Sequence, residues 1–307
     1  MALQPLDHLP TPAWPVALQQ HPLFAKALRH LGIEHRVIGW SNRVSDGAVL
    51  LMRRRFGPFG IDVASRPHLP PGVASELARM TRRWGTGLAI TPETATPAMG
   101  ALPVATPAHV AEWDLTHTSQ VRRKGLSGPW RTALHKAEGS DVKVMHLTPD
   151  RSDLLETLAR DARQQRRKGF RALPSHFTLA MGTVEPTALV LFQAQCADRV
   201  VAEALVVKHG AAASYHVGWT SPEGRKLQAM NLVLWTAANA LADRGIERFD
   251  LGLLATDRAP GLARFKIGTG AQVRTLGATL FFGPCTGFLS RYAASSGPAA
   301  KAPRRSA

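Results

Sequence analysis

The sequence predicts an α/β chain of the α+β kind: mixed, largely antiparallel sheets flanked by helices and repeated as a degenerate tandem pair. Three apolar runs, Thr187–Gln195, Arg199–Lys208 and Ala211–Trp219, are joined by turns at Ala197-Asp198 and His209-Gly210. Links this short favour hairpins, so these runs are predicted to pair in antiparallel fashion. Both halves of the chain also share one order of elements: antiparallel strands, a helix that ends in glycine, and a short strand.

The first half of the chain is predicted to contain a hairpin, two further strands and one amphipathic helix. The helix shows apolar residues at helical spacing and ends at a glycine. Residues 1–110 are expected to form a degenerate N-terminal copy. The predicted elements are strands over Ile33–Ser41, Gly47–Phe56, Gly60–Ser65 and Thr86–Thr91, a helix over Pro71–Trp84, and a loop over Pro92–Pro107.

The second half adds long helices to the three antiparallel strands. Residues 111–285 are expected to form one domain, and residues 286–307, rich in Ala, Ser, Pro and Arg, a flexible tail. The other predicted strands cover Ala111–Leu115, Val142–Leu147, Arg248–Leu251 and Ala271–Phe282; the helices cover Thr118–Glu138 with a break at Gly125–Pro129, Thr148–Lys168, a segment after Pro174, and Ser221–Gly245.

Composition places the chain among ordinary globular proteins. It has 307 residues, 45% of them hydrophobic and 20% charged, and no apolar run near the roughly 20 residues that span a bilayer. Residues 1–8 lack the basic and apolar regions of a signal peptide. Only Cys196 and Cys285 are present, which excludes a disulfide framework and a cysteine-rich metal site. A cytoplasmic protein is the expectation.

The formal net charge of +16, with a pI near 11.0, favours polyanionic partners. An RNA, a nucleotide cofactor or an anionic membrane face would each fit this charge. An arginine-rich composition spread over solvated faces explains it equally well. The charge makes an anionic ligand plausible without identifying it.

The start of the predicted helix after Ser221 is a candidate anion site. Gly224, Arg225 and Lys226 fall in its expected first turn, where cations oppose the helix dipole unless an anion lies between them and the free N–H groups. Asn231, further along the helix, is a candidate ligand contact or a solvated residue. We therefore expect donor phosphates at this helix start.

Four further residues are candidates for chemistry, each with a structural alternative. Glu203 shares a strand face with apolar residues, so desolvation would suit it as a general base; the alternative is an arginine partner on the next strand. His216 is either catalytic or a structural strand histidine. Asp250 ends a central strand, where it would orient an amine or cap a turn. Lys266 would contact an anion or lie on the surface.

Several chemistries are excluded by missing motifs. The sequence has no phosphate-binding G-x-x-x-x-G-K-[ST], no G-x-S-x-G nucleophile motif and no H-E-x-x-H zinc motif. Its twelve histidines show no ligand spacing. No metal is therefore expected. The basic clusters lack interleaved aromatic residues, which favours phosphate contact or plain solvation over base stacking.

Four segments in order resemble the Fem-type peptidoglycan aminoacyl transferases and their BioF2-like acetyltransferase relatives. The first two are Trp113-Asp-Leu-Thr and the helix and strand over Arg131–Val144, which contain Arg-x-x-x-x-Lys-Ala and Val-x-Val. The last two are Arg248-Phe-Asp-Leu-Gly252 and Gly261-Leu-Ala-Arg-Phe-Lys-Ile-Gly-Thr-Gly270. The resemblance covers about residues 111–282. It implies a GNAT-like fold, often in tandem, that transfers an acyl or aminoacyl group to an amine.

The resemblance implies three alternative functions. The leading one is an N-acyltransferase that uses acetyl-CoA or another acyl-CoA, with an amine acceptor whose identity is open. The second is a Fem-type transferase that uses aminoacyl-tRNA, and the third is an inactive binding module. The usual pyrophosphate loop, Arg/Gln-x-x-Gly-x-Gly/Ala, is replaced by Gly224-Arg-Lys-Leu-Gln-Ala229. This departure leaves the donor undecided between CoA and tRNA.

Overall fold

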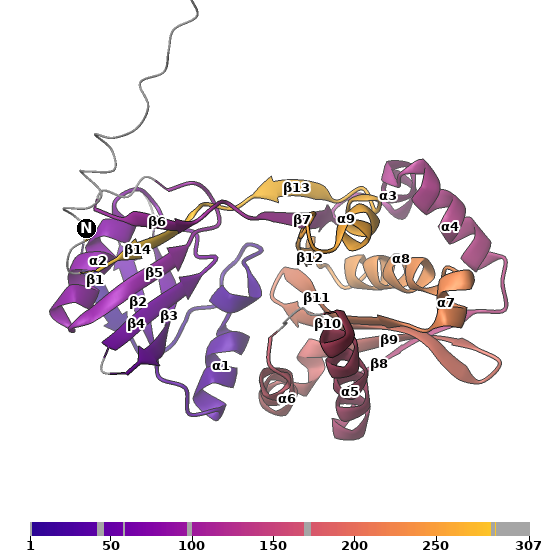
Figure 1. The fold of residues 1–307 in the computed structure, drawn as a ribbon, viewed down its shortest axis with the longest axis horizontal. Helices are drawn as coiled ribbons and strands as arrows, with labels where there is room; N and C mark the ends of the chain where they lie inside the picture. Colours follow the sequence, from indigo (N-terminus) through magenta and orange to yellow (C-terminus); the bar gives the residue numbers. More distant parts are fainter. Residues whose placement is uncertain are drawn as a thin grey trace, which may run out of the picture.

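Two seven-stranded sheets lie side by side and carry the helices (Figure 1). The computed structural model describes residues 2–41, 46–57, 59–96, 100–168, 173–283 and 286. The predicted tail, apart from Thr286, and Cys285 lie outside these residues. The strands of the first sheet are β1 (Ala2–Leu6), β2 (His35–Ser41), β3 (Asp46–Phe56), β4 (Phe59–Ser65), β5 (Thr86–Thr91), β6 (Leu102–Ala105) and β14 (Thr279–Phe282).

The second sheet holds the three strands whose short links predicted antiparallel pairing, and this prediction is confirmed. Its strands are β7 (His109–Asp114), β8 (Lys143–Leu147), β9 (Leu189–Cys196), β10 (Arg199–His209), β11 (Ala212–Thr220), β12 (Arg248–Leu253) and β13 (Gln272–Thr275).

The helices connect these strands and cover their faces (Figure 1). They are α1 (Pro22–His30), α2 (Val73–Arg83), α3 (Ser119–Gly125), α4 (Gly128–Glu138), α5 (Arg151–Lys168), α6 (Ser175–Val184), α7 (Pro222–Lys226), α8 (Ala229–Ala242) and α9 (Pro260–Ile267), with short 3-10 turns at Leu18–Gln20 and Pro186–Ala188.

The two sheets repeat one topology, so the predicted tandem pair is confirmed. The strand orders are β1-β2-β3-β4-β5-β14-β6 and β8-β9-β10-β11-β12-β7-β13. In each sheet only the fourth and fifth strands pair in parallel, and the other neighbours are antiparallel. We call the unit with β1–β5 the first copy and the unit with β8–β12 the second copy.

The copies exchange strands at their junction. One segment runs through β6 and β7, the other through β13 and β14, and each passes from one sheet into the other (Figure 1). As a result β14, expected in the second half, pairs with β5 and β6 of the first copy. The sequence of a short apolar strand does not show which sheet the strand joins, because tertiary contacts decide its place. The expected loop Pro92–Pro107 likewise contains β6.

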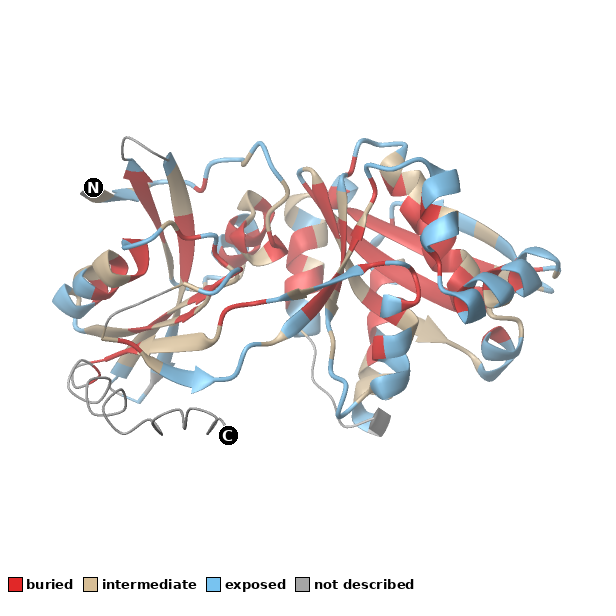
Figure 2. Ribbon diagram, turned by 90° about the horizontal axis from the view of Figure 1, so that it is seen from above, coloured by how far each residue is buried: buried red, intermediate tan, exposed pale blue. Residues whose placement is uncertain are grey.

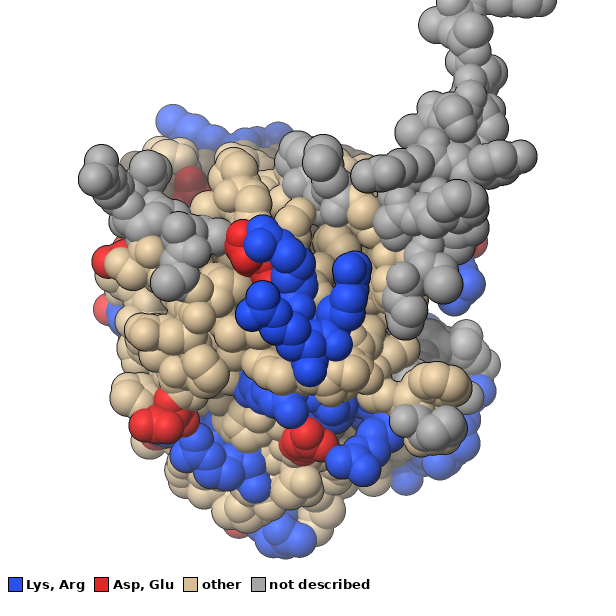
Figure 3. Space-filling view, turned by 90° about the vertical axis from the view of Figure 1, so that its left-hand side faces the viewer, with Lys and Arg blue, Asp and Glu red and all other residues tan. Residues whose placement is uncertain are grey.

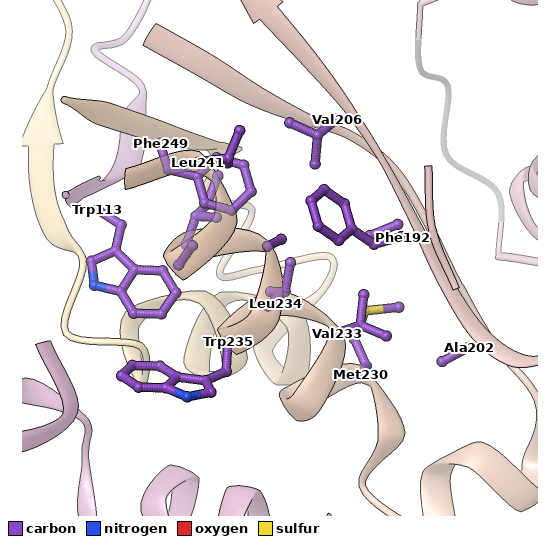
Figure 4. Packing of buried hydrophobic residues seen from close by; sticks show 14 of the residues in the cluster. Trp113, Phe192, Ala202, Val206, Met230, Val233, Leu234, Trp235, Leu241 and Phe249 are labelled. Carbon is purple, nitrogen blue, oxygen red and sulfur yellow. The ribbon is translucent and has the colours of Figure 1, made fainter. Parts of the chain in front are cut away.

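Apolar clusters fill both faces of the second sheet (Figure 2). On one face, helix α8 packs Val233, Leu234 and Leu241 against strand residues such as Phe192 and Phe249 (Figure 4). On the other face, α5, α6 and α1 cover Leu205 and Val207 of β10 and Val217 of β11, among others. Strands β9 to β12 are therefore the rigid centre on which polar residues are placed.

The predicted helix from Ser221 to Gly245 is divided into α7 and α8. Gln228 lies between them in the left-handed region with φ 56°, a conformation that a continuous helix does not contain. The side chain of Ser221 caps α7, whose five residues end at Lys226. The correction matters for function because it moves the predicted cations away from the start of the long helix.

Candidate active site

The two parallel strands of the second copy stop pairing after three residues, and we call the space beside the unpaired edge of β11 the opening. Strand β11 pairs with β12 only over Ala212–Ser214, opposite Arg248–Asp250. Its remaining residues, 215–220, have no partner on β12, so their backbone groups on that side are left without ladder bonds. In the first copy the matching strands β4 and β5 pair over six residues, from Gly60 to Ser65. The opening is therefore a property of the second copy alone.

A β-bulge at His216 marks the point where β11 leaves β12. Val206 pairs with Tyr215 and Leu205 with Val217, so His216 has no opposite residue on β10. Its Nε2 lies 2.7 Å from Oγ1 of Thr178 on α6. Burial lowers the pKa of His216 to about 4, which keeps the imidazole neutral near pH 7. A neutral, hydrogen-bonded histidine at this place holds the bulge against α6.

Tyr215 lies along the unpaired edge of β11. A Cβ built on Gly218 would stand 1.6 Å from the Tyr215 hydroxyl, so the ring occupies space that only glycine leaves. The hydroxyl also lies 3.9 Å from Sδ of Met230 in the first turn of α8. Burial raises the pKa of Tyr215, so the phenol keeps its proton. The opening thus contains a permanent O–H donor.

Glu203 lies on β10 under α5 and is fully buried. Its Oε2 accepts a hydrogen bond of 2.6 Å from Arg160, whose guanidinium lies 5.2 Å from the ring of Trp219. Burial raises the pKa of Glu203 although Arg160 opposes the shift. An arginine partner is therefore present, but it comes from helix α5 and not from the next strand as the alternative prediction had it. Glu203 has to give up this ion pair to act as a base.

Two further polar residues of α5 accompany Arg160. Gln164 donates a 2.9 Å hydrogen bond to the carbonyl of Gly218, on the unpaired half of β11. Asp161 is 7% exposed and accepts a 2.6 Å hydrogen bond from Gln165. Burial raises the pKa of Asp161. Helix α5 thus brings a second buried carboxylate beside β11, one that the sequence did not single out.

The predicted phosphate corner lies on α7. The N–H of Gly224 donates to Oγ of Ser221 at 2.9 Å, and a Cβ on Gly224 would stand 2.2 Å from the Val201 carbonyl. Arg225 and Lys226 are exposed and occupy the last turn of α7, where the helix dipole favours cations. The premise that they occupy the first turn of a long helix is wrong.

Asn231 is buried in the first turn of α8, where its N–H bonds the Gln228 carbonyl at 3.0 Å. It therefore lies closer to a helix start than the cations of α7 do. Helix α8 has 14 residues, so its first N–H groups carry the positive end of a full helix dipole.

Asp250 and Lys266 lie together at the far end of β12. Asp250 is 3% exposed, pairs with Arg66 of the first copy and accepts a 2.7 Å hydrogen bond from the N–H of Gly252. Nζ of Lys266 donates to the Leu253 carbonyl at 2.9 Å. Burial lowers the pKa of Lys266 to about 8, although Asp250 opposes the shift. These contacts hold the β12 wall of the opening.

Arg66 links this wall to the first copy. Its guanidinium lies 3.1 Å from Glu93 and 3.0 Å from Glu112, besides its contact with Asp250. Arg274 pairs with the same two glutamates. This largely buried charged network ties the two copies together, and an exposed ion pair between Lys26 of α1 and Glu185 also joins them.

The predicted site residues thus fall into three groups rather than one. Glu203 and His216 lie under α5 and α6, and Asp250 and Lys266 lie at the end of β12. The third group follows β11, with Gly224, Arg225 and Lys226 on α7 and Asn231 in the first turn of α8. Sequence reasoning missed Tyr215, Asp161 and Arg66. For Tyr215 the available signal was Gly218, the small residue three positions later. The places of Asp161 and Arg66 depend on long-range contacts.

Basic side chains gather on the end of the molecule formed by the first copy (Figure 3). They include Arg79, Arg82 and Arg83, which are exposed on α2 at helical spacing. No helix among the described residues is long and apolar enough to cross a membrane. Within the same residues no group of three or more potential ligands could hold a metal ion.

Comparison with known proteins matches this arrangement to a family. Residues 121–266, which contain α4 to α8, β8 to β12 and nearly all of α9, match the model of the acetyltransferase (GNAT) domain. This part of the chain is therefore similar to a GNAT acetyltransferase domain. The tandem GNAT-like fold of the chain agrees with the resemblance inferred from the four segments. Among curated proteins none matches the chain significantly.

Solved structures share the whole tandem fold. The crystal structure of FemX superimposes with a TM-score of 0.72 over 93% of this chain and 95% of its own, at 12% identity. The C-terminal domain of a putative lysylphosphatidylglycerol synthetase from Agrobacterium fabrum gives 0.56 over 91% and 93%, at 13% identity. A tandem GNAT protein from the clavulanic acid biosynthesis pathway gives 0.53 over 90% and 91%, at 12% identity.

Proposed function

We propose that this chain is an N-acyltransferase that moves an acyl group from acyl-CoA to an amine in the opening between β11 and β12. The supporting observation is the contrast between the copies. In the first copy the parallel strands β4 and β5 pair over six residues. In the second copy the parallel strands β11 and β12 pair over only three residues. A donor with amide groups, such as the pantetheine arm of CoA, could hydrogen-bond the free edge of β11 as an added strand does.

The residues around the opening would divide the work. The N-terminus of α8 would receive the donor phosphates, with Asn231 beside it and Arg225 and Lys226 of α7 within the same loop region. The hydroxyl of Tyr215 would donate a proton or hydrogen bond to the departing thiolate. Asp250 and Lys266 would keep β12 apart from β11. Transfer then depends mainly on positioning the amine against a polarised carbonyl.

The alternative donor is aminoacyl-tRNA. Two observations favour it: the basic end face of the first copy (Figure 3) and the absence of an intact pyrophosphate loop before α8. A tRNA would bind through phosphate contacts, and this binding would weaken steeply with salt.

A thermal-shift comparison separates these functions. Acetyl-CoA, a long-chain acyl-CoA and tRNA are each added to the full chain, and the melting temperature is measured. A ligand at about 100 times its Kd adds about 2.7 kcal/mol to the folded state. Stabilisation by an acyl-CoA, followed by amine-dependent thiol release, supports the proposal. Stabilisation by tRNA alone supports the second donor, and stabilisation by none supports a binding module.

A further inference from the structure

The inner face of α5 places a polar stripe against the unpaired half of β11. Thr157, Asp161 and Gln164 lie at helical spacing, so they share one face of the helix. Gln164 bonds the Gly218 carbonyl directly, which holds this stripe beside the opening. Asp161 contributes to raising the pKa of Tyr215, whose hydroxyl lies over Gly218, so the carboxylate is electrostatically coupled to the centre of the opening.

Asp161 and Glu203 are both buried carboxylates, yet their surroundings differ. Arg160 neutralises Glu203 at 2.6 Å. No cation among the described residues forms an ion pair with Asp161, which accepts a hydrogen bond from the neutral amide of Gln165. A buried carboxylate without a cation is costly to the fold unless a ligand supplies the positive charge. This asymmetry makes Asp161, not Glu203, the carboxylate with an unmet requirement.

A neighbouring oxygen atom has a similar requirement. Oγ1 of Thr157, one helical turn before Asp161, is buried and has no hydrogen-bond partner in the described part of the chain. A buried hydroxyl without a partner calls for a polar group beside it. A primary ammonium group brings one positive charge and three N–H donors.

We propose that Asp161 receives the ammonium group of the acceptor and takes its proton before acyl transfer. The inference rests on the proposed function and adds the acceptor class: a molecule that presents a primary ammonium ion to α5 and β11. Glu203, held by Arg160, then positions this end of α5 and does not accept the proton.

The proton balance of the step is complete. Asp161 carboxylate takes one proton from R–NH3+, which leaves a neutral amine. The amine nitrogen forms a bond to the thioester carbonyl carbon, the C–S bond breaks, and the second N–H proton passes to the thiolate as the amide forms. The proton on Asp161 is released to solvent at the end of the cycle. Burial favours the first transfer because it disfavours both charged forms.

The decisive variant is Asp161→Asn, compared with Glu203→Gln and with Asp257→Asn as a surface control. Asp257 undergoes the same chemical change and is 78% exposed. We expect Asp161→Asn to be as stable as the wild type or more stable, because it removes a buried charge that pairs with no cation in the described part of the chain. It should lower the amine-dependent kcat about 10²- to 10⁴-fold. A loss of stability together with unchanged activity would mean that Asp161 is structural and would overturn the inference.

A binding measurement keeps the test independent of turnover. Butylammonium and tetramethylammonium chloride, at equal ionic strength, are compared as stabilisers in thermal-shift assays. Tetramethylammonium has the charge but no N–H donor, so only butylammonium should raise the melting temperature of the wild type, and neither should raise that of Asp161→Asn. Equal effects on both proteins, or no effect on the wild type, overturn the inference. Absence of any acyl-CoA effect instead contradicts the proposed function, whatever the amine result.

Discussion

Arg66 offers the sharpest test of how the first copy supports the active site. It is 12% exposed and joins Asp250 on β12 to Glu93 and Glu112. Replacement by Met keeps most of the side-chain volume but removes the charge. Arg274 still holds both glutamates, so Asp250, 4% exposed, is the carboxylate that loses its direct ion-pair partner.

The expected cost follows from this burial. Removing one partner of a buried ion pair typically costs about 3–5 kcal/mol, because a charge remains without compensation. Asp250→Asn should lower the free energy of unfolding by less, since Arg66 still pairs with two carboxylates. In the double variant no unpaired Asp250 charge remains. The double variant should therefore lose about 1–3 kcal/mol less than the sum of the losses of the two single variants.

Urea unfolding followed by circular dichroism and tryptophan fluorescence measures these differences. Arg79→Met is the matched control, since the Arg79–Glu76 pair is exposed and should contribute no more than about 1 kcal/mol. Effects of Arg66→Met and Asp250→Asn that add within about 0.5 kcal/mol would refute the reasoning, because they would show no coupling between the two side chains. A loss equal to that of the control would refute it as well.

Two further predictions concern α7 and the β12 wall. Gly224→Ala should destabilise the chain by about 1–3 kcal/mol, because the new methyl group meets the Val201 carbonyl, which cannot move without its strand. Gly261→Ala, where a Cβ meets nothing within 4 Å, should be neutral or stabilising in the same urea titration; equal losses would contradict the argument. Lys266 has its pKa lowered to about 8 in the fold, so the unfolded chain binds more protons above pH 8 and stability should rise from pH 8 toward 10.5. Lys266→Met should flatten this rise in unfolding experiments across that range, and an unchanged slope would mean that another group causes it.

Much of the second copy could be predicted from local signals. The two-residue turns at Ala197-Asp198 and His209-Gly210 correctly predicted the antiparallel strands β9 to β11. The division of the long helix at Gln228 was missed, because glutamine is a good helix former and only the surrounding fold holds it at φ 56°. The placement of β14 in the first sheet was missed because a four-residue apolar strand does not specify its sheet.

The sequence by itself determined the class of fold, the tandem order of elements and the segments that resemble acyltransferases, because periodicity and turn chemistry are local properties of the chain. Only the tertiary structure decided which charges meet. Glu203 was selected for its apolar strand face, but Arg160 comes from a helix 43 positions away, and Asp250 meets Arg66 across 184 positions. Ion pairing and desolvation depend on distances of a few ångströms in space. The opening between β11 and β12 likewise arises from the separation of the two strands, which cannot be recognised in the sequence of either strand.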